Sequence, residues 1–174
     1  NYIGHTNASN FTGHKHFWDS DQTVHRSSRW MASVKMASER VIGTELVNED
    51  NLKGFYMGDG ALYTYCRGDE YLNVFPFWNW RKIPGITSYE SDAPVPAFKR
   101  YGAHVRNETD FVGGVTDGRT GMTAMQLNRD GLQACKSWIC TDEFVLCLGA
   151  GIQADTTLAV TTSIEQRNKQ GDLL

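Results

Sequence analysis

The histidines of the sequence His14-Lys15-His16 are a pair whose type and spacing could do chemistry. Side chains two positions apart on a strand point to the same side, so these imidazoles could ligate a metal, with His5 and His25 nearby. No third ligand follows at a fixed spacing. Ordinary surface or cleft histidines are the stronger interpretation, and we predict no metal site from this motif.

Aromatic residues are concentrated in the segment 75–87, which reads Phe-Pro-Phe-Trp-Asn-Trp-Arg-Lys-Ile-Pro-Gly-Ile-Thr. Trp78 and Trp80 could stack on sugar rings, because the C–H face of a sugar suits an aromatic surface. Two tryptophans on one face of a strand are also typical of a core. Composition alone favours the core.

The four cysteines are Cys66, Cys135, Cys140 and Cys147, and they form no Cys-x-x-Cys pair. No histidine stands at a spacing typical of zinc fingers. The last three lie in apolar, strand-like runs, which predicts buried free thiols. The sequence also lacks a nucleophile elbow, a P-loop, a Rossmann fingerprint and an HExxH motif.

The net charge of -3 argues against a generic binder of polyanions, so we expect no nucleic-acid partner. No apolar run approaches the roughly 20 residues that span a bilayer, and we expect no membrane partner. Between Arg81 and Arg106, however, five basic residues stand against two acidic ones, a local charge of +3. Such a stretch could face an anionic ligand or form a solvated loop.

Alternation with a period of two residues dominates the chain, and its 174 residues fit one domain. Residues 30–38 alternate in polarity, and residues 55–57 and 61–65 flank a Gly-Asp-Gly turn that precedes a further run at 71–75. Later runs cover residues 122–127, 132–140, 144–148 and 158–164, with turn residues between them. This spacing predicts an all-β, antiparallel β-sandwich. Residues 77–101 alternate little and are expected to form a long surface excursion with a function.

Five blocks of the sequence resemble the central β domain of the family-8 polysaccharide lyases, which include chondroitin, hyaluronan and xanthan lyases. The blocks are residues 48–60, 75–87, 111–118, 134–138 and 146–152. Ile86 and the segment 7–18 are more similar to the chondroitinases than to the xanthan lyases. The resemblance implies a bacterial enzyme that is secreted or periplasmic. It also implies an N-terminal α-helical toroid domain and a C-terminal β domain, both absent from these residues.

The resemblance further implies cleavage of uronic-acid polysaccharides by β-elimination. Most catalytic residues of the family lie in the helical domain, so this chain alone is expected to be inactive. Glu45 matches a glutamate that holds a catalytic arginine and tyrosine in position. Asn48 matches an asparagine that hydrogen-bonds the sugar. From residue type alone, Glu45 could equally be a turn carboxylate.

Two departures from the family pattern limit what is carried over. Where related lyases hold a structural calcium, this chain has Asn79, Arg81, Glu90 and Ser91. An arginine cannot ligate a cation, so calcium is not expected there and no other cofactor is implied. Where related enzymes place a stacking tryptophan, the chain offers Tyr101, preceded by Arg100. We therefore predict Asn48, Tyr101, Arg100 and Trp78 as substrate-binding residues for a glycosaminoglycan.

Two alternatives stay open at this point. One is a non-catalytic, glycan-binding or structural β-sandwich, because the chain has no general base of its own. The other is a lyase for hyaluronan rather than for chondroitin or dermatan sulfate. The sequence of this domain is compatible with both lyase substrates.

Overall fold

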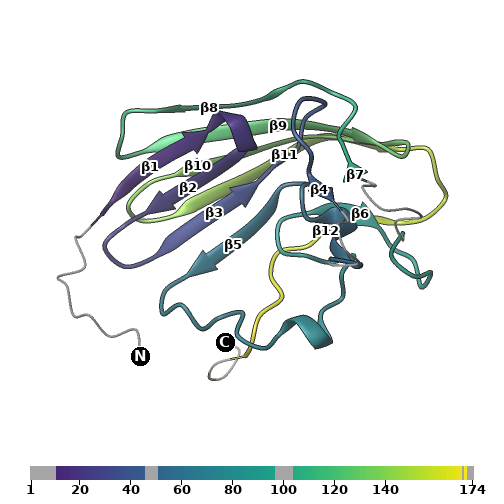
Figure 1. Cartoon of the computed structure of the whole chain (residues 1–174), viewed down its shortest axis with the longest axis horizontal. Coiled ribbons are helices and arrows are strands. Elements are labelled where there is room, and N and C mark those ends of the chain that lie inside the picture. The colour runs from purple at the N-terminus through teal and green to yellow at the C-terminus, as the bar shows by residue number, and fades with distance from the viewer. Residues whose placement is uncertain (1–10, 46–50, 97–103, 170, 172–174) are drawn as a thin grey trace.

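A computed structural model describes residues 11–45, 51–96, 104–169 and 171. Its two main sheets each have four antiparallel strands and stack face to face (Figure 1). The first sheet has the order β1-β2-β3-β5. Its strands are β1 (Gly13–Phe17), β2 (Gln22–Arg26), β3 (Met31–Lys35) and β5 (Ala61–Tyr65).

The second sheet has the order β11-β10-β9-β8. Its strands are β8 (Val112–Thr116), β9 (Gly121–Arg129), β10 (Leu132–Cys140) and β11 (Val145–Ala154). A two-residue turn of Asp130 and Gly131, both with positive φ, joins β9 to β10. Such a turn matches the twist of its flanking strands. The long β9–β10 hairpin supplies the two inner strands of this sheet.

The main core lies between the two sheets. Ala32 and Val34 of β3 face inward, as do Met125 of β9 and Trp138 of β10, and all four are buried. Inward residues alternate with outward ones along β3, β9 and β10, as the pleat requires. At one side of the sandwich the edge strands meet, since the His14 amide donates to the Gly118 carbonyl at 3.1 Å.

Two small sheets gather at one end of the sandwich (Figure 1). One pairs β4 (Thr44–Glu45) with β7 (His104–Val105), and the other pairs β6 (Thr87–Tyr89) with β12 (Val160–Thr162). Three single 3₁₀ turns complete the described elements: Trp18–Ser20, Gly54–Tyr56 and Phe75–Phe77. No helix among the described residues is long and apolar enough to cross a membrane.

A second core cluster lies beside the main one and is mostly aromatic. Tyr56, Tyr71 and Trp78 are buried there together with Ile83 and Ile86. This cluster corrects the expectation that residues 77–101 run wholly over the surface. The part from Ile83 to β6 is anchored in the interior, since Thr87 and Ser88 are buried as well.

The predicted all-β antiparallel sandwich is confirmed. The strands expected at 30–38, 61–65, 122–127, 132–140, 144–148 and 158–164 all contain observed strands. The strand expected at 55–57 is wrong, because that stretch forms a 3₁₀ turn that buries Tyr56 in the second core. The run 71–75 is not a strand either; it leads into the 3₁₀ turn at Pro76, which has no backbone N–H to donate to a sheet.

The prediction of buried thiols holds for Cys140 only. Cys135 and Cys147 are exposed, and so is Cys66. Cys135 points outward from β10, and the pattern of buried residues along that strand places Trp138 and Cys140 on the opposite, inner face. The apolar run around Cys135 therefore reflects an apolar outer face, on which Leu146 and Leu148 of β11 are also exposed.

Candidate functional site

Glu45 is the outward-facing residue of the short strand β4. Its neighbour Thr44 is buried and accepts a hydrogen bond from the Asn51 side chain at 2.6 Å. In the ladder with β7, Glu45 stands opposite His104 and Thr44 opposite Val105. The main chain at Glu45 is therefore held in a sheet while its carboxylate is exposed. Among the residues that the structure describes, no ion pair engages Glu45.

Three of the predicted substrate-binding residues lie outside the described residues: Asn48, Arg100 and Tyr101. The predicted substrate contacts of Asn48, Arg100 and Tyr101 stay predictions.

Trp78 is a core residue, as composition favoured, and this corrects its assignment to substrate. Its ring is 6% exposed and packs between Tyr71 and Phe75, while its indole N–H donates to the Gln166 carbonyl at 2.9 Å. A ring enclosed in this way has no free face for a sugar. The most exposed ring of the segment is Phe77 instead, with 88% of its surface accessible.

Arg81 fastens the segment that follows. Its guanidinium donates to the Tyr56 hydroxyl at 2.7 Å and to the carbonyls of Pro94 at 2.8 Å and Ala93 at 3.2 Å. Glu90, a second position that the family resemblance relates to a calcium site, pairs with Lys82 at 2.9 Å. These two positions are thus occupied with protein partners.

A hollow of about 340 Å³ opens beside this segment, and Arg81 and Tyr56 line it together with Tyr89 and Arg129. Beneath it Arg129 forms an ion pair with Asp59, and both side chains are nearly inaccessible. The guanidinium also lies over the Phe55 ring, 4.5 Å from its centroid. Arg129 thus joins the end of β9 to Phe55 in the 3₁₀ turn Gly54–Tyr56, which adjoins β4, and to Asp59 just after that turn.

Electrostatics at Asp59 are dominated by burial. Burial raises the pKa of Asp59, against the opposing effect of Arg129 and Lys136. Burial also lowers the pKa of Lys136 to about 8, and its ammonium donates to the carbonyl oxygens of Asp59 and Gly85. In the sequence Asp59 and Arg129 look like ordinary turn residues. They are 70 positions apart, so no local pattern indicates that they form a pair.

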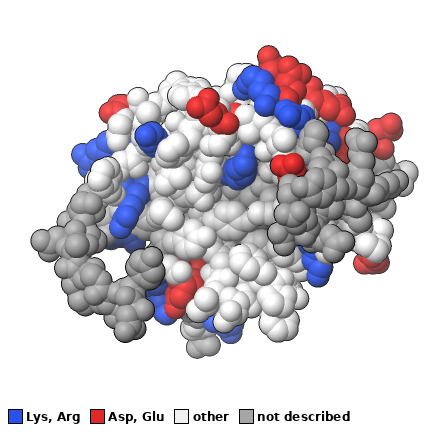
Figure 2. All heavy atoms as spheres, in the orientation of Figure 1, with Lys and Arg blue, Asp and Glu red and all other residues white. Residues whose placement is uncertain are grey.

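The basic stretch between Arg81 and Arg106 does not present one charged band among its described residues. Arg81 and Lys82 are bound to protein partners, and Arg106 donates to the Glu39 carbonyl at 2.7 Å. On the face shown in Figure 2, basic side chains are scattered and acidic ones gather toward one end. A second group of arginines, missed in the sequence, lies elsewhere: Arg26, Arg29 and Arg67 line one hollow with Tyr65.

Comparison with known proteins places these features in a family. Residues 12–174 match the model described as polysaccharide lyase family 8, super-sandwich domain. A chondroitinase AC of Pedobacter heparinus is 40% identical over 92% of this chain and 23% of its own length. A hyaluronate lyase of Thermasporomyces composti is 35% identical over 89% of the chain and 20% of its own length.

Solved structures agree with the sequences. A chondroitinase AC lyase matches with a TM-score of 0.86 and 39% identity, over 91% of this chain and 23% of the other. The chain thus spans less than a quarter of the length of these relatives.

Proposed function

The chain belongs to polysaccharide lyase family 8, and we propose that it forms one wall of the substrate cleft in a lyase for chondroitin-type glycosaminoglycans. The observation that carries the proposal is the 40% identity to a chondroitinase AC over 92% of this chain. A helical domain outside these residues would supply the opposite wall.

The proposed reaction is β-elimination at a uronic acid. A base removes the proton at C5, the electron pair forms a double bond between C4 and C5, and the bond from C4 to the glycosidic oxygen breaks. That oxygen takes up a proton as it leaves. The C5 proton is only weakly acidic beside a charged carboxylate, so the site must neutralise the carboxylate and stabilise the charge that develops on it.

Glu45 is proposed as a positioning residue for this reaction. Its carboxylate is exposed on β4, and the ladder with β7 together with the buried Thr44 fixes its main chain. A carboxylate held in this way can accept charge-assisted hydrogen bonds from an arginine and a tyrosine across the cleft. Asn48 is proposed to bind the sugar beside it, and Arg100 and Tyr101 are proposed to contact the sulfated chain.

The test is Glu45→Ala in the full-length protein, with chondroitin sulfate as substrate and the ultraviolet absorbance of the unsaturated product as readout. Two charge-assisted hydrogen bonds contribute roughly 1.5–3 kcal/mol each. Their loss should lower kcat about 10²-fold or more. KM should change much less, and Glu45→Gln should recover part of the rate, since an amide oxygen still accepts.

Glu39→Ala is the matched control, because Glu39 is an exposed carboxylate in the same part of the chain. It should keep full activity. Near-normal turnover by Glu45→Ala would remove Glu45 from the site without affecting the family assignment. Hyaluronan is assayed in parallel, since a hyaluronate lyase is 35% identical to this chain. Binding of both polymers without any absorbance change would instead identify a non-catalytic module.

A further inference from the structure

Two histidines face each other inside the sandwich, at its end away from the β9–β10 turn. His14 of β1 and His25 of β2 are register partners in the first sheet, and their ring centroids are 5.6 Å apart. Both side chains point between the sheets and are 5% and 0% exposed. They are therefore part of the interior rather than surface histidines.

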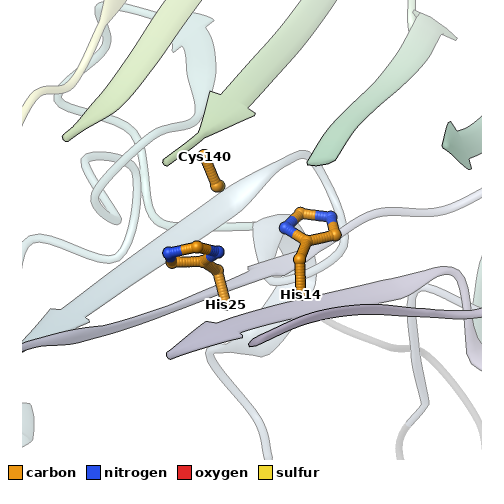
Figure 3. A group of neighbouring side chains, drawn as sticks. All are labelled: His14, His25 and Cys140. Carbon is orange, nitrogen blue, oxygen red and sulfur yellow. The ribbon is translucent and has the colours of Figure 1, made fainter. Parts of the chain in front are cut away.

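Cys140 approaches the same point from the opposite sheet. It is the last residue of β10 and is fully buried, and its thiol points toward the two imidazoles (Figure 3). One ligand atom from each of the three residues lies within 4.8 Å of the others. Residues far apart in sequence thus converge from three strands of two sheets.

The imidazole nitrogens of His14 and His25 are buried without hydrogen bonds to the described residues. Burial lowers the pKa of His25, and the nearby Thr141 carbonyl opposes that shift without reaching hydrogen-bond geometry. A buried polar group without a partner is costly, and most such groups in folded proteins are satisfied. Four unused nitrogens beside a buried thiol point to a bound ligand.

The residues around His14, His25 and Cys140 also leave room for these side chains and hold them in place. Gly121, the register partner of Cys140, makes room for His14, because a Cβ there would lie 2.2 Å from the imidazole Cδ2. Trp30 packs on His25 with ring centroids 4.9 Å apart. Its indole N–H donates to the Asp142 carbonyl at 3.1 Å, which fixes the chain just after Cys140.

We propose that His14, His25 and Cys140 bind a soft transition-metal ion, Zn²⁺ in the first instance, which joins the two sheets. Two imidazoles and one thiolate form a donor set that suits zinc and does not suit calcium or magnesium. Zinc–nitrogen and zinc–sulfur bond lengths place tetrahedral ligand atoms about 3.3–3.6 Å apart. The three ligand atoms lie within 4.8 Å of one another, so binding one ion would draw them closer together.

Zinc binding at this site would release one proton, that of the Cys140 thiol. Burial lowers the pKa of His14 to about 4 and also lowers that of His25, so both imidazoles offer lone pairs at neutral pH. Burial raises the pKa of the Cys140 thiol to about 12. Zinc displaces that proton to solvent as the sulfur–metal bond forms. Water would complete the coordination, and the site's role would be structural.

The experiment uses the full-length protein, stripped of metal with a chelator and then equilibrated with Zn²⁺ or Co²⁺. We expect one tightly held zinc per chain that depends on Cys140. With cobalt we expect a thiolate-to-metal charge-transfer band. Cys140→Ser should abolish the band and weaken zinc binding by more than the roughly 10–100-fold typical of outer-shell changes. The control Cys135→Ser, an exposed cysteine of the same strand, should leave both unchanged.

The wild-type cobalt spectrum decides the proposal even if Cys140→Ser fails to fold. Absence of the charge-transfer band in the wild-type protein overturns the site, and so does its persistence in a folded Cys140→Ser variant. Gly121→Ala gives a second check, because it crowds the His14 ring without removing a ligand. It should weaken zinc binding, whereas unchanged binding would contradict the geometry. None of these outcomes depends on lyase activity.

Discussion

The buried ion pair between Arg129 and Asp59 supports a quantitative prediction about stability. Arg129→Met keeps most of the side-chain stem and removes the guanidinium, which leaves the Asp59 carboxylate buried without its partner. Both side chains are less than a tenth exposed. Removing one member of such a pair destabilises a protein by about 3–5 kcal/mol. The ammonium of Lys136 lies close by, which favours the lower end of that range.

Hydrogen exchange of the β9–β10 amides in the full-length protein measures this loss without requiring a single unfolding transition. Where reclosing outpaces exchange, a loss of 3–5 kcal/mol corresponds to exchange about 10²- to 10⁴-fold faster, at 1.36 kcal/mol per factor of ten. The effect should be confined to the second sheet and the 3₁₀ turn Gly54–Tyr56.

The destabilisation of Arg129→Met should depend on pH, and the pKa of Asp59 sets the direction. The pKa of Asp59 is raised by burial, and loss of Arg129 raises it further. A carboxyl with a raised folded-state pKa binds more protons folded than unfolded, so the free energy of unfolding falls as pH rises through that window. Arg129→Met should therefore be most destabilised at neutral and alkaline pH and least in acid.

A double variant can refute this reasoning. In Arg129→Met with Asp59→Asn no unpaired carboxylate is left buried, so about half of the lost stability or more should return. If the double variant exchanges as fast as Arg129→Met alone, the cost lies in lost packing of Arg129 on Phe55 and not in the unpaired carboxylate.

Two further predictions concern Lys136 and the glycine turns. Burial lowers the pKa of Lys136 to about 8 from 10.5, so the folded chain binds fewer protons between those values. Relative to Lys136→Met, wild-type stability should then rise from pH 8 to 10.5 by on the order of 3 kcal/mol, and a flat difference in denaturation profiles would contradict it. Gly60→Ala should cost roughly 2–4 kcal/mol, because φ is +85° and a Cβ would meet the Trp138 ring at 2.7 Å. Gly68→Ala, with φ +99° but open space, should lose only the backbone part, and equal losses of thermal stability would argue against the clash.

The parts of the fold that sequence patterns predict are those governed by local alternation. The runs at 122–127 and 132–140 belong to the β9–β10 hairpin, whose pleat and turn residues are encoded locally. The aromatic runs at 55–57 and 71–75 look equally strand-like. They fold into 3₁₀ and other turns because Tyr56 and Tyr71 pack into a second core that only the tertiary structure creates.

The candidate sites depend on contacts that no local pattern contains. The pair His14 and His16 is visible in the sequence and lies on one face of β1 as expected, but the proposed ligand set uses His14 with His25 and Cys140. Their convergence needs the register of β1 with β2 and the packing of two sheets. Glu45 emerges only through the family resemblance, because an exposed carboxylate on a short strand has no distinguishing local signature.

The two ends of the β9–β10 hairpin have different surroundings, and this separates the two proposed roles. At the turn end, Arg129 joins β9 to the 3₁₀ turn that adjoins β4, where Glu45 stands. At the open end, Cys140 and Gly121 meet His14. The eight steps from Leu132 to Cys140 along β10, at about 3.3 Å each, put roughly 26 Å between these ends. A metal at the open end would therefore hold the sheets together away from the proposed cleft wall. Its removal should reduce stability and leave unchanged the role proposed for Glu45, which lies on β4 near the turn end of the hairpin.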